Sequence, residues 1–205
     1  MQIYRTNAKE NIYMQETEPV NRDYNCMQAV HLYPEHTYQT WKGFGGAFTE
    51  AAGYTWSKLT SVSQKEFTDA YFSPDGIGYT FCRMHINSCD FALDNYAYLE
   101  EAPDEEWSKF DTARDGKYIL PLVHAAMQTN QDEMTFLASP WSPPAFMKTN
   151  GEMNHGGSLK AEYAHTWAQY IARYVKACAK EGVKISYLTV QNLSLIHISE
   201  PTRPY

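Results

Sequence analysis

Met134-Thr135-Phe136-Leu137-Ala138 runs directly into Ser139-Pro140-Trp141-Ser142-Pro143-Pro144. The first five residues have the short apolar pattern of a buried strand. The prolines stiffen the segment that follows, so Trp141 is held just beyond the end of that strand. Parallel α/β sheets carry their functional groups at the carboxyl ends of their strands. The segment therefore predicts a site beside Trp141, with a core tryptophan in a proline-rich turn as the alternative.

Alternating strands and helices extend from this segment in both directions. Ser158–Glu181 has apolar and aromatic residues at spacings of three and four, which predicts a helix, and Gly182 follows as its C-cap. Ile185–Val190 and Gly78–Ile86 are predicted strands, and Tyr118–Gln128 is a predicted helix. Successive βα units with continuous apolar strands predict a parallel sheet with helices outside. A doubly wound sheet and a (β/α)8 barrel both fit this pattern.

The pattern changes near Thr40. Trp41–Phe48 is a glycine-rich apolar run, and Ala51–Phe72 reads as one amphipathic stretch. Before residue 41 we expect a β-rich margin of short strands separated by polar turns. On the helical stretch the expected apolar face comprises Leu59, Val62, Phe67 and Tyr71, and the expected early strands are Gln2–Thr6, Ile12–Gln15 and Ala29–Leu32.

Composition excludes several classes of protein. The 205 residues carry a net charge of −7 with no basic block, which argues against binding of nucleic acid or an anionic membrane. The four cysteines have no CxxC spacing, so we expect free thiols, and neither a zinc site nor a disulfide framework. The first residues lack the apolar run of a signal peptide, which predicts a cytoplasmic protein. No apolar run is long enough for an integral membrane segment.

Three further side chains are candidate site residues. Glu50 follows Gly43-Phe44-Gly45-Gly46 and would project at a strand's carboxyl end; the alternative is a surface acid after a tight turn. Arg83 is a charge inside an apolar strand, where a buried arginine needs a partner, unless the position is an exposed edge. Asn192 ends a buried-strand pattern with two amides, where side chains commonly position substrate hydroxyls or simply start a loop. At such a rim, rigid Trp141 suits a wall on which a sugar ring stacks.

Two segments after the predicted strand Gly78–Ile86 carry polar side chains. Asn87-Ser88-Cys89-Asp90-Phe91 places polar groups at a strand end, and His85 just before it is interpreted as structural. The long polar stretch from Asp90 to Gly116 contains an acidic cluster, which predicts a solvated loop and not a metal site.

Taken together, these segments resemble glycoside hydrolase family 30, the glucosylceramidase-like retaining β-glycosidases, over nearly all of residues 41–192. The resemblance implies that residues 41–192 are strands one to four of a (β/α)8 TIM barrel, and that residues 1–40 are strands of a side β-sandwich. It implies two catalytic carboxyl groups about 5–5.5 Å apart, one a nucleophile and one an acid/base, and no cofactor or metal. The implied substrate is a β-glucoside or glycan, with β-1,6-glucan oligosaccharides and xylosides as variants. The oligomeric state is left open.

By this resemblance Glu50 and Trp141 contact the substrate, Asn192 binds the sugar 2-hydroxyl, and Arg83 supports the site. The family's Asn-Glu-Pro string starts at Asn192, but Leu193 occupies the acid/base position and the nucleophile falls beyond the sequence. Residues 193–205 look like a translated sequencing adapter, a non-native tail in which Glu200 has no role. We therefore expect an inactive chain. The alternative is a non-catalytic carbohydrate-binding or inert fragment.

Overall fold

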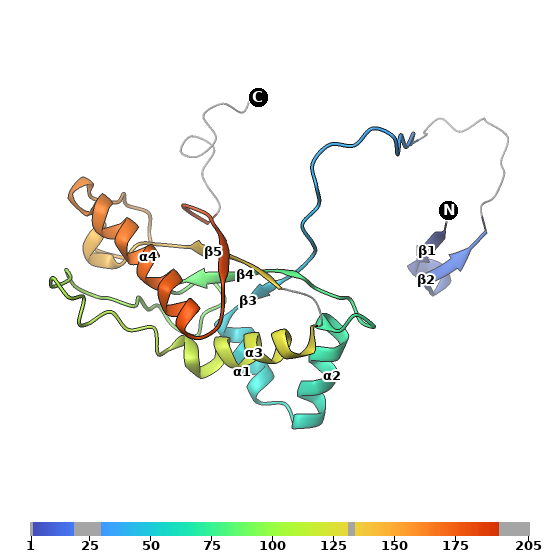
Figure 1. Ribbon diagram of the computed structural model, residues 1–205, viewed down its shortest axis with the longest axis horizontal. Coiled ribbons are helices and arrows are strands. Elements are labelled where there is room, and N and C mark those ends of the chain that lie inside the picture. Colours follow the sequence, from blue (N-terminus) through green and yellow to red (C-terminus); the bar gives the residue numbers. More distant parts are fainter. Residues whose placement is uncertain (1, 19–29, 131–133, 193–205) are drawn as a thin grey trace. The chain divides into compact units, whose positions relative to one another are not determined.

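The computed structural model describes residues 2–18, 30–130 and 134–192. The predicted tail and Leu193 lie outside the described residues. The chain divides into two compact units, Met1–Thr40 and Trp41–Tyr205, which are described separately (Figure 1).

The first unit is a small hairpin. Strand β1 (Ile3–Asn7) pairs antiparallel with β2 (Ile12–Thr17), and the 3₁₀ turn η1 (Ala8–Glu10) joins them. Two of the predicted strands are therefore present. The third is wrong over residues 30–32, which form no strand and are exposed, while Ala29 lies outside the described residues. Membership of a side β-sandwich stays a prediction.

The second unit is built on a four-stranded parallel sheet (Figure 1). The strands are β3 (Ala47–Phe48), β4 (Phe81–Ile86), β5 (Thr135–Pro140) and β6 (Ile185–Leu188), and they neighbour one another in chain order. A doubly wound sheet would reverse its strand order partway, whereas a barrel adds each strand beside the last. The sheet is the first half of a TIM barrel, as predicted.

Two helices cover Ala51–Phe72, where the sequence predicts an amphipathic stretch. Helix α1 (Glu50–Ser57) ends at Lys58, and α2 (Ser61–Phe72) starts afresh because the Thr60 side chain accepts a hydrogen bond from the Ser63 N–H as an N-cap. The predicted apolar face is wrong at Leu59 and Val62, which are 39% and 66% exposed, whereas Phe67 is partly buried and packs against the core. Helix α2 also buries Thr68 and Phe72.

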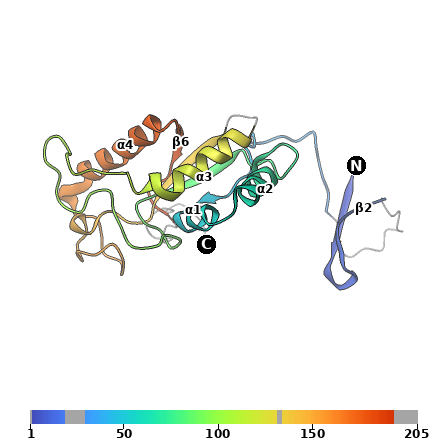
Figure 2. The same ribbon diagram turned by 90° about the horizontal axis from the view of Figure 1, so that it is seen from below.

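The remaining helices complete the outer layer. Helix α3 (Asp115–Thr129) packs against both α1 and α2 (Figure 2). The 3₁₀ turns η2 (Ala145–Met147) and η3 (Ala161–Tyr163) precede α4 (Ala164–Lys180), which starts later than the predicted helix. Gly182 follows α4 with a φ of 79°, the left-handed backbone expected of a C-capping glycine.

The core lies between the sheet and these helices. Strand β4 shows the alternation: Cys82, Met84 and Ile86 are buried, whereas Phe81 and Arg83 point to the other face and are half-buried. Helices approach closely at Gly53 of α1, where an added Cβ would lie 2.3 Å from the Tyr118 carbonyl oxygen of α3. That contact leaves no room for a side chain.

The segment between β4 and α3 is more than a solvated loop. Its acidic cluster is exposed, as predicted. However, Tyr96, Tyr98, Leu99 and Trp107 are each at most 7% exposed, and so belong to the core. Tyr98 stacks on Tyr174 of α4 with ring centroids 5.4 Å apart. These aromatic residues fix the loop against the carboxyl ends of the strands.

Candidate functional site

Arg83 of β4 is the centre of a cluster at the carboxyl end of the sheet. Its Nε donates to Ser139 Oγ at 3.0 Å and its Nη2 donates to Asn192 Oδ1 at 2.7 Å. Its guanidinium carbon lies 4.5 Å from the ring centroid of Trp141, in cation–π geometry. One side chain thus links β4 to the ends of β5 and β6. The structure brings Arg83, Trp141 and Asn192 together, although their roles with a substrate stay predictions.

The backbone around Trp141 is fixed from both neighbouring strands. The carbonyl oxygen of Pro140 accepts from the Asn192 N–H at 2.8 Å. That of Trp141 accepts from Gln191 Nε2 at 2.6 Å, and that of Ser142 accepts from Asn87 Nδ2 at 3.1 Å. We call residues 140–142 the carbonyl segment. Because all three of its carbonyls have donors, the indole is attached to a backbone with little freedom.

Asn87 follows β4 with a φ of 63° and is completely buried. The left-handed region is accessible to asparagine more readily than to most residues. Its Oδ1 accepts from the Tyr98 N–H at 3.3 Å and from the Tyr170 hydroxyl of α4. The Asn87 side chain therefore donates on one side and accepts on the other, which fixes the orientation of the amide. The sequence alone marks this residue only as a polar group at a strand end.

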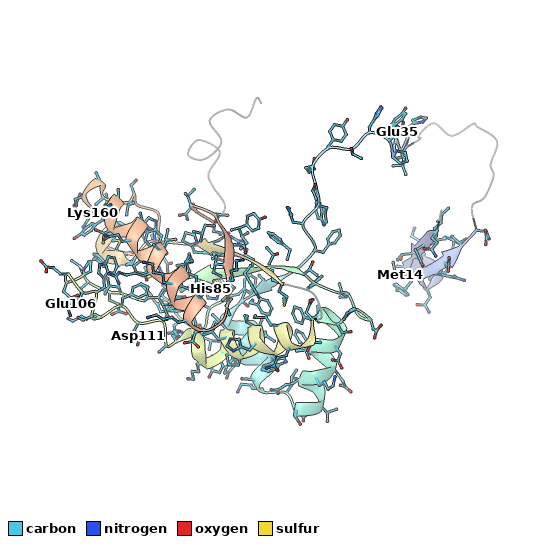
Figure 3. All side chains as sticks on the ribbon, in the orientation of Figure 1. Met14, Glu35, His85, Glu106, Asp111 and Lys160 are labelled. Carbon is cyan, nitrogen blue, oxygen red and sulfur yellow. The ribbon has the colours of Figure 1, made fainter. Side chains whose placement is uncertain are left out.

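His85, which is labelled in Figure 3, contacts both Glu50 and Trp141. Its Nε2 accepts from the Glu50 backbone N–H at 3.2 Å, so Nδ1 carries the proton and donates to the Asn87 carbonyl at 2.5 Å. Its ring meets Trp141 edge-on, with centroids 6.4 Å apart. Burial lowers the pKa of His85. This geometry agrees with the structural role expected from the sequence.

Glu50 is not part of the cluster around Trp141. Its side chain is 3% exposed and its carboxylate accepts from Arg114 Nε at 2.7 Å, from Arg114 Nη2 at 3.1 Å and from the Leu93 N–H at 2.8 Å. Burial acts to raise the pKa of Glu50, but these donors and the Arg114 charge outweigh it, and the pKa is lowered. The acid orders the loop after β4. Its predicted contact with substrate stays a prediction without support in this geometry.

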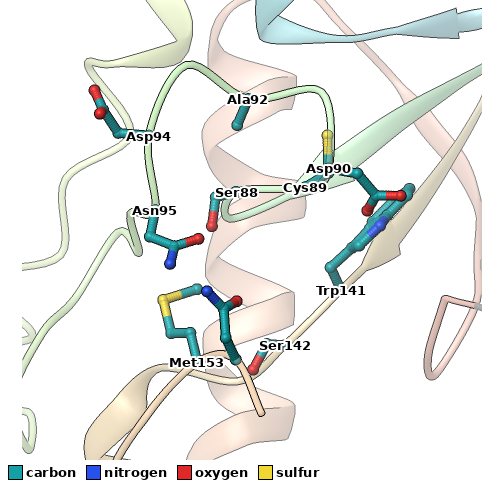
Figure 4. A pocket seen from close by; sticks show the side chains of 10 residues that line it. Ser88, Cys89, Asp90, Ala92, Asp94, Asn95, Trp141, Ser142 and Met153 are labelled. Atoms are coloured by element: carbon teal, nitrogen blue, oxygen red, sulfur yellow. The ribbon is translucent and has the colours of Figure 1, made fainter. Parts of the chain in front are cut away.

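A cavity of about 490 Å³ opens beside the cluster (Figure 4). Trp141 and Asp90 stand on one side of it, and Asn95 and Met153 on the other, with Ser88 between them. Hydrogen-bonding groups dominate its lining. Asp90 was part of the strand-end segment noted in the sequence, and its place directly after β4 was the signal that could have identified it.

Residues 149–158 form a loop that is closed at its base and carries Met153 to the cavity. Lys148 and Leu159 form a β-bridge, and the Thr149 N–H donates to the Ser158 carbonyl at 2.9 Å. Inside the loop the buried Lys148 ammonium donates to the Met153 carbonyl at 2.9 Å. Burial lowers the pKa of Lys148. This loop, which we call the rim loop, is held mostly by its own hydrogen bonds.

Metal-ligand clusters and membrane-spanning helices are both absent from the described residues. In the part of the chain that the structure describes, no three His, Cys, Asp or Glu side chains gather as metal ligands. Over the same residues, no helix combines the length and hydropathy needed to cross a bilayer.

The family follows from comparison with known proteins. The protein-family model described as "Glycosyl hydrolase family 30 TIM-barrel domain" matches residues 41–200 of this chain. The chain belongs to glycosyl hydrolase family 30. Among curated relatives, the chain is 37% identical over 166 residues to the lysosomal acid glucosylceramidase of Mus musculus, and the match covers 78% of this chain and 32% of that protein. It is 30% identical over 165 residues to the endo-1,6-beta-D-glucanase of Neurospora crassa, and the match covers 78% of this chain and 34% of that protein.

Two solved structures have the same fold over most of this chain. SrfJ from Salmonella typhimurium matches with a TM-score of 0.83 and 36% identity, covering 93% of this chain and 43% of that one. The endo-beta1,6-glucanase BT3312 matches with a TM-score of 0.75 and 26% identity, and the match covers 93% of this chain and 42% of that one. The chain thus spans less than half the length of these relatives.

Proposed function

We propose that this chain supplies the sugar-binding part of a retaining β-glycosidase site that acts on β-linked glucosides or glucans. The observation that carries the proposal is the rigid Trp141 wall at the edge of a cavity with a polar lining, at the carboxyl ends of the barrel strands. Aromatic faces pack against the apolar C–H faces of sugar rings, and polar side chains around them bind the hydroxyls.

One feature of the cavity favours a sugar over an apolar ligand. The carboxylate of Asp90 lies beside the indole of Trp141 and, when ionised, accepts hydrogen bonds (Figure 4). A hydrogen-bond acceptor next to an aromatic ring suits a ligand that carries hydroxyls on its edges and C–H groups on its faces.

The chemistry of retaining glycosidases assigns the remaining roles. One carboxylate attacks the anomeric carbon while a carboxylic acid protonates the leaving oxygen, and that second group later activates water. The Asn192 amide, held by Arg83, would bind the sugar next to the acid/base. In this sequence Leu193 follows Asn192. A leucine side chain transfers no proton, so we propose that this chain binds a β-glucoside without hydrolysing it.

The test is titration of the purified chain with methyl β-glucoside by isothermal calorimetry. We expect Trp141→Ala to weaken binding at least about tenfold, because it removes the stacking surface. Trp41→Ala is the matched control, because Trp41 is 65% exposed and lies outside the cavity lining. Equal affinities of wild type and Trp141→Ala would contradict the proposal.

An aryl β-glucoside assay distinguishes the proposed binding-only chain from the alternative, an active enzyme. We expect no release of the aryl group above the buffer blank. Release that disappears in Trp141→Ala would show an active enzyme and overturn the assignment of Leu193.

A further inference from the structure

We propose that Asn87 is a positioning residue for the Trp141 wall, which it acts on through the carbonyl of Ser142. This inference rests on the proposed sugar-binding role of Trp141. Asn87 lies behind the wall and is fully buried, so it does not line the cavity. Its Nδ2 donates to the Ser142 carbonyl at 3.1 Å, one residue after the indole.

Position 87 places three demands on one side chain. The φ of 63° favours asparagine, aspartate or glycine. The Tyr170 hydroxyl needs an acceptor there, which the Tyr98 N–H also shares at 3.3 Å, and the Ser142 carbonyl needs a donor. Aspartate supplies the acceptor but, when ionised, no donor, and glycine supplies neither. Asparagine alone of the three meets every demand.

The orientation of the amide is itself fixed by helix α4. Tyr170 is fully buried on that helix, and its hydroxyl also accepts from the Tyr98 N–H at 2.7 Å. The amide therefore cannot rotate without losing its acceptor contacts to both Tyr98 and Tyr170. Since Gln191 holds the preceding carbonyl from β6, Asn87 supplies the matching restraint from β4. Without it, one side of the carbonyl segment is free to move.

The test uses Asn87→Asp, which keeps the shape, the backbone preference and the acceptor but removes the donor. Its carboxylate would face the Ser142 carbonyl oxygen, and the two oxygens would repel. The chain is labelled with 5-fluorotryptophan, and the Trp141 fluorine resonance is assigned from Trp141→Phe. We expect that resonance to shift in the free protein. We also expect the affinity for methyl β-glucoside to fall about tenfold, which is the change that corresponds to the loss of one buried hydrogen bond.

Asn130→Asp is the matched control. Asn130 is also a buried amide that donates to backbone carbonyls, those of Phe72 at 3.1 Å and Tyr79 at 2.8 Å, and it lies outside the cavity lining. We expect it to reduce stability while leaving the Trp141 resonance and the affinity unchanged. If the two variants behave alike, the positioning role is overturned.

A second variant covers the case in which Asn87→Asp does not fold. Tyr170→Phe removes only the hydroxyl that bonds Asn87, and we expect a smaller shift of the Trp141 resonance. An unchanged resonance in that variant overturns the proposal. The fluorine measurement needs no ligand, so it decides the role of Asn87 even if Trp141→Ala shows that the cavity binds no glucoside.

Discussion

At the scale of single residues, two carboxyl groups on either side of Arg114 have opposite pKa shifts. Glu50 bonds Arg114 directly and its pKa is lowered. Asp115 is 3% exposed and accepts hydrogen bonds from the hydroxyls of Tyr98 at 2.7 Å and Tyr96 at 3.4 Å. These hydroxyls do not offset its desolvation, and burial raises the pKa of Asp115 to about 7. Direct pairing with a cation therefore decides which of the two acids stays ionised.

The raised pKa of Asp115 predicts a dependence of stability on pH. The folded state holds this proton up to about pH 7, whereas the unfolded chain releases it near 3.8. Protonated Asp115 therefore contributes fully to the unfolding free energy below pH 4, and this contribution is lost as the pH rises toward 7. The change is up to roughly 4 kcal/mol. We expect Asp115→Asn to flatten the fall in unfolding free energy between about pH 4 and pH 7, measured by urea denaturation. Equal slopes for wild type and variant would contradict this assignment.

Much of the site could be predicted from single residues, but not its connections. Arg83, Trp141 and Asn192 stand out because each follows or interrupts an apolar strand, and parallel strands bring such positions together. The pairing of Glu50 with Arg114, and the bonds from Asn87 to Tyr170 and Ser142, join residues far apart in sequence. No local pattern marks those partners, since they depend on how the loop after β4 folds.

At the scale of elements, the order of strands and helices was predictable and their boundaries were not. Continuous apolar strands separated by amphipathic helices predict the parallel sheet, which the structure confirms. The split between α1 and α2 depends on one capping hydrogen bond at Thr60. Apolar residues such as Val62 and Leu59 fit a helical period yet remain on the surface. Periodicity indicates a face but does not say whether another element covers it.

The close approach of α1 to α3 gives an element-scale prediction. Gly53→Ala would place a Cβ 2.3 Å from the Tyr118 carbonyl oxygen, so the helices must separate. We expect a loss of about 2 kcal/mol in unfolding free energy, because overpacking outweighs the roughly 1 kcal/mol gain in helix propensity. Gly116→Ala is the control: its added Cβ meets nothing within 4 Å, so it should stabilise α3. The unfolding free energies of both variants are measured by urea denaturation. A higher value for Gly53→Ala than for wild type would contradict the close contact.

At the scale of the whole molecule, the second unit carries large apolar side chains on its surface. Leu188 of β6 is 49% exposed and Val190 just after it is 82% exposed, and Phe44 near β3 is 67% exposed. Within the described residues, β3 and β6 each pair along one edge only. Unpaired strand edges and apolar patches promote association.

We therefore expect the purified 205-residue chain to self-associate and to bind an apolar dye. Leu188→Lys should raise the monomer fraction in sedimentation velocity, because it places a charge on the edge strand. Val62→Lys, on the outer surface of α2 at 66% exposure, should leave the monomer fraction unchanged. A monomeric wild type at micromolar concentration would contradict the expectation.

The way the rim loop is fastened has a consequence for evolution and engineering. Its base is closed by the Lys148–Leu159 bridge, and its interior is tied by Lys148 and by Asn150, which donates to the Asn154 carbonyl at 2.9 Å. The carbonyl segment, by contrast, is anchored to β4 and β6. The two sides of the cavity thus have separate supports. Sequence changes between residues 149 and 158 can alter one side while the aromatic wall keeps its place, so ligand preference can diversify among related barrels without rebuilding the part that holds the ring.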